Sequence, residues 1–150
     1  MNKEFMDLAF HYADLAFKSG EVPSGCVIVK ENEVISFGFN SKEQHNSIFN
    51  HAEIIAIKRA SKKLNNWRLD GCDLYVTLDP CPMCASAIKQ SRIKNVYSAL
   101  NNSDSNNLAI INEIFEKNDK VNSFVNFFSN LDQERSKTLL NKFFQLQRNK

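Results

Sequence analysis

The sequence lacks a long apolar run and a large excess of one charge. No stretch approaches the ~20 apolar residues of a bilayer span, and no basic segment followed by an apolar run opens the chain. The formal net charge is +2, which speaks against a histone-like nucleic-acid binder and against an acidic solvating tail. We therefore expect a cytoplasmic protein with no membrane partner.

Internal repeats and linkers rich in proline or glycine are missing as well. The chain has only 4 glycines and 3 prolines among 150 residues. An aromatic content of 11% excludes a disordered chain, and this length is enough to bury one hydrophobic core. Residues 1–150 are therefore predicted to form a single domain.

Cysteines are few, and they are unevenly spaced. The chain has Cys26, Cys72, Cys81 and Cys84, and a disulfide framework is not expected in a chain of this size without a secretion signal. Cys26 and Cys72 stand singly beside apolar strand patterns, which is typical of buried free thiols. Cys81 and Cys84 form a Cys-x-x-Cys pair, which favours metal binding or redox chemistry.

Helical and strand-like patterns alternate along the chain. Helical spacing of apolar residues, with Gly20 as a stop, predicts a first helix over residues 3–17. Further helices are predicted over 51–64 and from Pro82 to about residue 92, and strands over 26–30, 33–39, 73–78 and 94–99. The two strands from 26 to 39 read as a hairpin. This order predicts a layered α/β domain, with parallel neighbouring strands around the helices at 51–64 and 82–91.

The last third of the chain has weaker signals. The polar run at residues 101–107 is typical of a surface loop. From Asp132 onward, an apolar stripe on a basic helix is expected to pack against the sheet or a partner; it comprises Leu139, Leu140, Phe143, Phe144 and Leu146.

Two of the predicted helices begin with residues that bind metals. The start of a helix carries a positive partial charge, which favours thiolates and carboxylates and lowers the pKa of a thiol. His51 at one helix start, with Cys81 and Cys84 on one face of the other, gives one nitrogen and two sulfur ligands. Such a set suits a tetrahedral Zn²⁺ whose fourth position is open to water, as in catalytic zinc sites.

Glu53 follows the histidine by two residues and is not needed as a ligand. It suits a general acid/base that takes a proton from the bound water. Each element alone has an ordinary explanation: a lone histidine is usually a surface or core residue, a glutamate complements the helix dipole, and a Cys-x-x-Cys pair can be redox-active. Together, with Pro80 directly before Cys81, they favour a zinc enzyme.

His-x-Glu followed by Pro-Cys-x-x-Cys is the signature of zinc-dependent nucleobase deaminases. The chain resembles the bacterial tRNA adenosine deaminases of the cytidine-deaminase superfamily over nearly its whole length. The similar stretches are EVPSGCVIV, GFN, HAEIIAI, NWRLDGCDLYVTLDPCPMCASAI, SRIKNVYSA and LLNKFFQLQR. NWRL, the YVTL before the cysteines and the terminal FF followed by a basic residue point to this member of the superfamily.

The resemblance implies a three-layer α/β/α fold with a mixed sheet of about five strands. It also implies hydrolytic deamination of the wobble adenosine in a tRNA anticodon stem-loop to inosine, with one Zn²⁺ per subunit, Glu53 as proton shuttle and a homodimer as the assembly. Matched positions suggest that Asn40 hydrogen-bonds the flipped nucleotide. They also suggest pocket contacts from Leu78 and Pro80 and anticodon-loop contacts from Phe144 and Arg148.

Several positions depart from the family pattern. Ser24 replaces valine, Phe49-Asn50 replaces Thr-Ala, Asp79 replaces glutamate, and Asn101 stands where relatives carry an aspartate close to the sugar-phosphate backbone of the substrate. None of these changes touches the metal ligands.

The departures leave a second enzymatic function open, the deamination of a free guanine- or cytosine-type base or nucleoside. A non-catalytic zinc-stabilised nucleic-acid-binding module would leave Glu53 unexplained, and a redox protein would leave both His51 and Glu53 unexplained.

Overall fold

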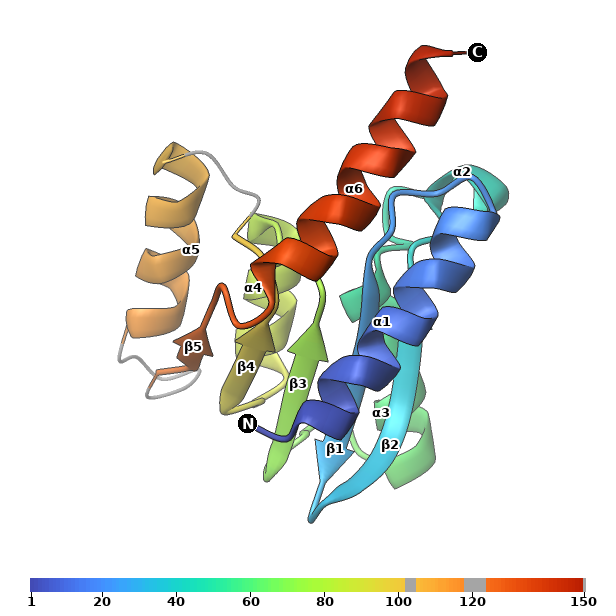
Figure 1. The fold of residues 1–150 in the computed structure, drawn as a ribbon. Coiled ribbons are helices and arrows are strands. Elements are labelled where there is room, and N and C mark those ends of the chain that lie inside the picture. The colour runs from blue at the N-terminus through green and yellow to red at the C-terminus, as the bar shows by residue number, and fades with distance from the viewer. Residues whose placement is uncertain (102–104, 118–123, 150) are drawn as a thin grey trace.

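The computed structural model describes residues 1–101, 105–117 and 124–149, and five strands of these segments form one sheet. The strands are β1 (Gly25–Lys30), β2 (Glu33–Phe39), β3 (Cys72–Val76), β4 (Asn95–Ser98) and β5 (Asn126–Phe128), in the order β2-β1-β3-β4-β5 (Figure 1). β1 is antiparallel to both β2 and β3, whereas β3, β4 and β5 are parallel. The predicted mixed sheet is confirmed.

Helices cover both faces of this sheet. On one face α1 (Lys3–Lys18) packs through Met6, Ala9 and Phe10 against β1 and β3. The opposite face is covered by α3 (Ala52–Leu64), α4 (Pro82–Gln90) and α5 (Ser105–Glu116), which share one apolar core. Successive side chains of a strand point to opposite faces, so Val27 belongs to the first core and Cys26 and Ile28 to the second. The three-layer α/β/α prediction is therefore confirmed.

Two details of the sequence prediction are wrong. The helix predicted over 82–92 does connect the parallel neighbours β3 and β4, but α3 does not connect neighbours. The chain leaves β2 at the sheet edge and crosses over β1, so that β3 lies beside β1 and antiparallel to it. The expected surface loop at 101–107 ends early, because α5 begins at Ser105; residues 102–104 lie outside the described segments.

α3 lies unusually close to the sheet. The most deeply buried apolar positions of α3 are Ala52, Ala56 and Ala60, all of them small. Gly38 explains this close packing, because a Cβ at Gly38 would lie 2.3 Å from the carbonyl oxygen of Ala52. Small residues on both sides thus bring the beginning of α3 down onto β2.

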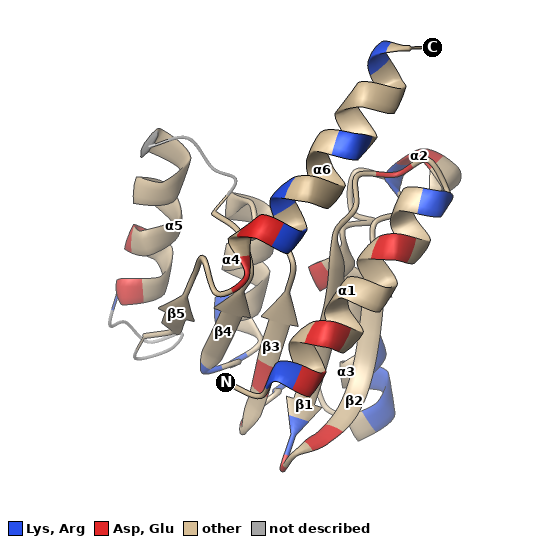
Figure 2. Ribbon diagram, viewed as in Figure 1, with Lys and Arg blue, Asp and Glu red and all other residues tan. Residues whose placement is uncertain are grey.

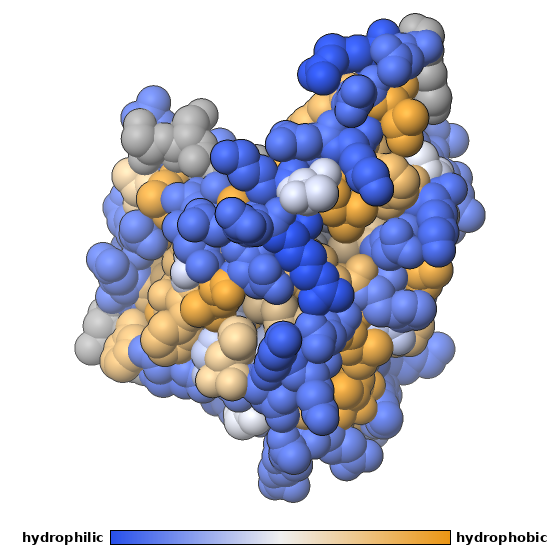
Figure 3. All heavy atoms as spheres, viewed as in Figure 1, coloured by the Kyte–Doolittle hydropathy of each residue, from blue (hydrophilic) through white to orange (hydrophobic). Residues whose placement is uncertain are grey.

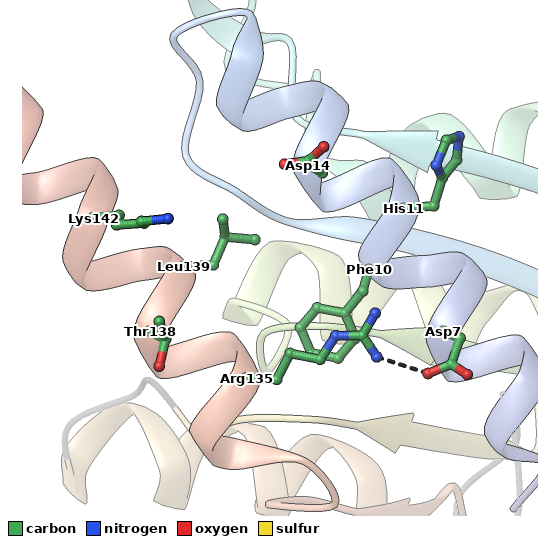
Figure 4. A pocket seen from close by; sticks show the side chains of 8 residues that line it. All are labelled: Asp7, Phe10, His11, Asp14, Arg135, Thr138, Leu139 and Lys142. Carbon is green, nitrogen blue, oxygen red and sulfur yellow. Dashed lines mark hydrogen bonds and ion pairs between the residues drawn. The ribbon is translucent and has the colours of Figure 1, made fainter.

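α6 (Gln133–Arg148) is attached by its first half. The Arg135 guanidinium is 2.7 Å from the Asp7 carboxylate and lies over the Phe10 ring at 4.2 Å, at one side of a 450 Å³ cleft between α1 and α6 (Figure 4). The Ser136 hydroxyl donates to the carbonyl oxygen of Thr77. The far half extends beyond the sheet (Figure 1) and carries apolar surface (Figure 3).

A short helix, α2 (Lys42–His45), lies in the segment between β2 and α3. Among the residues that the structure describes, none of the helices has both the length and the apolar character needed to cross a bilayer.

Candidate metal centre

The expected metal ligands stand at the first positions of α3 and α4. His51 is the N-cap of α3 and Cys81 the N-cap of α4, both with extended backbone, and Pro82 occupies the first turn of α4. Neither N-cap side chain makes a capping hydrogen bond to its own helix. The imidazole and the Cys81 thiol instead contact each other at 3.7 Å.

Three ligand atoms converge at this point. His51 Nδ1 lies 3.7 Å from Cys81 Sγ and 3.5 Å from Cys84 Sγ, and all three atoms are within 4.8 Å of one another. A tetrahedral Zn²⁺ with ordinary zinc–sulfur and zinc–nitrogen bond lengths requires ligand separations of roughly 3.5 to 3.8 Å. The two nitrogen–sulfur distances therefore match those of a zinc site.

The protonation of the two thiols is unequal when no cation lies between them. A hydrogen bond from the Cys84 thiol, and a second contact with His51, lower the pKa of Cys81 to about 4. The same bond to Cys81, together with burial, raises the pKa of Cys84. The lowered pKa of Cys81 thus comes from its hydrogen bonds, and the expected lowering of thiol pKa values by the helix start stays a prediction.

Glu53 lies beside these ligands and is 4% exposed. Burial raises the pKa of Glu53 to about 7, although a hydrogen bond to its own backbone N–H opposes this shift. A carboxyl group with a pKa near neutrality can both take up and release a proton under physiological conditions. A buried carboxyl group at this place is suited to general acid/base chemistry.

A 610 Å³ cavity opens next to His51. Its volume is within the range of small-molecule sites in proteins. It is lined by Ser19, Gly20, Glu21, Val22, Asn40, Lys42, Glu43, His51, Phe143 and Gln147. The lining therefore combines the segment that follows α1, the α2 segment and the second half of α6.

Asn40 is the one predicted substrate residue that lines this cavity. Its Oδ1 accepts a hydrogen bond of 2.9 Å from the backbone N–H of Ala52, directly after the metal-binding histidine. The bond ties the end of β2 to the beginning of α3 and fixes the amide beside the metal centre.

The other predicted contact residues are placed differently. Leu78 and Pro80 are buried, and Leu78 packs against Leu100 and Leu140. Phe144 is 45% exposed and Arg148 is exposed, and neither lines the cavity.

Asn101 lies further along the chain, after β4. Its backbone N–H donates to Asn130 Oδ1. This bond ties the end of β4 to the turn before α6.

Glu21, Phe143 and Gln147 were not predicted to contact the substrate. Phe143 and Gln147 are four residues apart, and that spacing places them on one side of a helix. This four-residue spacing in the sequence could have indicated that the two residues share one side of the helix. For Glu21 the sequence gave no signal beyond its place in the similar stretch EVPSGCVIV. The carboxylate of Glu21 accepts hydrogen bonds from the backbone N–H groups of Glu43 and Gln44, and so holds the α2 segment.

Comparison with known proteins agrees with this geometry. The family model described as "Cytidine and deoxycytidylate deaminase zinc-binding region" matches residues 1–100. A tRNA-specific adenosine deaminase of Aquifex aeolicus (strain VF5) is 42% identical over 151 residues, which cover 99% of this chain and 98% of the relative. Relatives of the same name from Streptococcus pyogenes match over 57 to 62% of their own length.

Two solved structures are similar along nearly the whole chain. One, from studies of A-to-I editing by tRNA:A34 deaminases at the wobble position of transfer RNA, has a TM-score of 0.80 and 32% identity, and the match covers 93% of this chain and all of that one. A guanine deaminase from Bacillus subtilis has a TM-score of 0.66 and 32% identity, with 100% of this chain and 96% of that one covered. The chain belongs to the zinc-binding cytidine and deoxycytidylate deaminase family and, within it, to the tRNA-specific adenosine deaminases.

Proposed function

We propose that this protein hydrolyses the wobble adenosine of a tRNA anticodon to inosine, with one zinc ion per chain held by His51, Cys81 and Cys84. The observation that carries the proposal is the convergence of these three ligand atoms within 4.8 Å, beside a buried Glu53 and a cavity that α6 helps to line. A structural zinc site would have no use for such a glutamate.

The zinc ion, when bound, lowers the pKa of a water molecule and thereby supplies the nucleophile. With zinc bound, Glu53 would take one proton from the attacking water and give it to the adenine ring nitrogen, and would then carry the second proton of that water to the departing amine. A carbon–oxygen bond forms at the amino-bearing carbon, the carbon–nitrogen bond breaks, and ammonia leaves. Asn40, held by the Ala52 N–H, hydrogen-bonds the flipped nucleotide.

The C-terminal helix supports a polymeric substrate. Phe143 and Gln147 line the cavity, while Phe144 and Arg148 lie on more exposed parts of the same helix. A flipped base within the cavity and flanking nucleotides on the outer face of α6 would both contact this element. Aromatic and guanidinium groups suit that role, because unstacked bases of single-stranded loops stack on them.

The assembly and the setting belong to the same proposal. We infer that residues 1–150 act as one domain, that two copies form a homodimer and that the protein works in the cytoplasm. Leu78, Pro80 and Asn101 complete the proposed substrate contacts, with Leu78 and Pro80 behind the base and Asn101 near the sugar-phosphate backbone.

A second candidate is deamination of a free base. The similar guanine deaminase and the size of the cavity favour it. The two functions are separated by incubating purified, zinc-loaded protein with total tRNA from its host and sequencing the products for inosine, with Glu53→Ala as the control. Inosine at one wobble position supports tRNA editing, whereas turnover of guanine without any inosine in tRNA would reject it.

A further inference from the structure

An exposed tryptophan lies between two arginines, in the loop that follows α3. Trp67 is 59% exposed, and the guanidinium carbons of Arg68 and Arg92 lie 5.5 and 5.2 Å from the centre of its ring. Arg68 is oriented by Asp70 at 2.9 Å. Arg92 has a φ of 73°, a left-handed conformation that is uncommon for residues other than glycine. Large apolar exposure and backbone strain in one place are typical of binding surfaces rather than of cores.

Basic residues precede this tryptophan along the chain. The eleven residues from 58 to 68 include Lys58, Arg59, Lys62, Lys63 and Arg68 but no acidic residue, in a chain whose net charge is only +2. All five are exposed, and Figure 2 shows Lys and Arg positions along α3 behind β2. The helix dipole favours cations in the last turn of α3, but it does not explain an exposed tryptophan beside them.

We propose that this basic-aromatic patch, formed by Lys58, Lys62, Lys63, Trp67, Arg68 and Arg92, binds the phosphate backbone of the tRNA outside the anticodon loop. The inference rests on the proposed function and extends it to a second RNA contact. The guanidinium group of arginine can donate two parallel hydrogen bonds to phosphate oxygens, and lysines add positive charge that attracts the phosphates. The indole ring can stack on a base or a ribose.

Trp67, Lys62 and Lys63 lie at or just after the end of α3 that is remote from the metal centre, whereas Lys58 lies halfway along the helix. α3 has 13 residues and begins directly after His51, so its two ends are separated by roughly 20 Å at 1.5 Å per residue. An RNA whose target base is in the cavity would therefore meet the patch with nucleotides remote from that base. Contacts of this kind bind phosphates and carry little sequence information.

The test compares two substrates and three variants. Trp67→Ala and Lys63→Ala remove parts of the patch, and Lys3→Ala is the control, because Lys3 is an exposed lysine of α1 and the change in net charge is the same. Deamination is measured on full-length tRNA and on a trimmed anticodon stem-loop. Binding of full-length tRNA is measured against salt concentration.

Trp67→Ala should reduce kcat/KM for full-length tRNA roughly fivefold or more, as expected for a lost stacking contact. Lys63→Ala should lower the salt slope of tRNA binding by about one unit. Turnover of the stem-loop and all properties of Lys3→Ala should stay as in the wild type. Equal losses on both substrates, no loss on either, or a change in oligomeric state would overturn the proposal; the last would make the patch an interface between copies. Failure of the wild type on both substrates would instead reject the proposed function.

Discussion

Replacing Gly38 with alanine should damage the metal centre more than its small size suggests. The added Cβ would lie 2.3 Å from the Ala52 carbonyl oxygen, 2.9 Å from the Ala56 nitrogen and 3.1 Å from the Ile55 Cβ. Two of these atoms are backbone, so the beginning of α3 must move away from β2. Overpacking of this kind costs about 1–3 kcal/mol, which corresponds to a fall in Tm of about 2–12 °C for a domain of this size.

The catalytic effect should be larger than the loss of stability. His51 and Glu53 lie at the end of α3 that moves, and a displacement of about 1 Å can lower a rate roughly 10²-fold. Kinetics on an anticodon stem-loop, zinc content and thermal unfolding together measure the effect. Gly71→Ala is the control, because its φ of 78° makes alanine unfavourable there while the nearest atom to a new Cβ is the Lys30 Cε at 3.7 Å. If both variants lost equal activity at an equal fall in Tm, the close contact between Gly38 and α3 would not be what positions His51 and Glu53.

Cys84→Ala should bind less than one zinc ion per chain by metal analysis, because it removes a buried ligand; full zinc content would refute the assignment. In zinc-free protein, burial raises the pKa of Glu53 from 4.5 to about 7, so its stabilising contribution is present below pH 4.5 and is lost as the pH rises to about 7. Denaturant unfolding should therefore show wild type losing up to about 3 kcal/mol relative to Glu53→Gln over this interval, and parallel pH curves would contradict it. Phe143→Ala should destabilise the protein by about 3–5 kcal/mol, since Phe143 is buried, whereas Phe144→Ala should mainly raise KM for tRNA; the reverse pattern would exchange their roles.

Strong local periodicity made much of the fold predictable. The helices α1, α3 and α4 and the strands β1 to β4 carry repeated apolar positions, and Gly or Pro marks an end of α1, α4, β1 and β3. β5 has only three residues, Asn126–Phe128, too few to show any period. Whether the chain crosses β1 between β2 and β3 depends on which strands pair with each other. Strand pairing is decided by residues throughout the sheet and not by the local pattern of α3.

The metal centre was predictable because its ligands sit at fixed offsets from two helix starts. His51, Cys81 and Cys84 needed only local spacing and elementary ligand chemistry. Residues that line the cavity, such as Glu21 and Phe143, come from elements that meet only in the folded chain. The close approach of α3 to Gly38 was hidden for the same reason, because it depends on a contact between segments distant in sequence.

The proposed zinc centre acts on adenosine within an RNA loop. The most direct measurement compares kcat/KM of one zinc-loaded preparation on an anticodon stem-loop with a wobble adenosine and on free guanine and cytidine, with Glu53→Ala alongside. We expect inosine to form in the stem-loop and the small substrates to show negligible turnover. Glu53→Ala should lose activity by about 10²- to 10⁴-fold at unchanged zinc content. Faster turnover of guanine or cytidine than of the stem-loop, or full activity without Glu53, would contradict it.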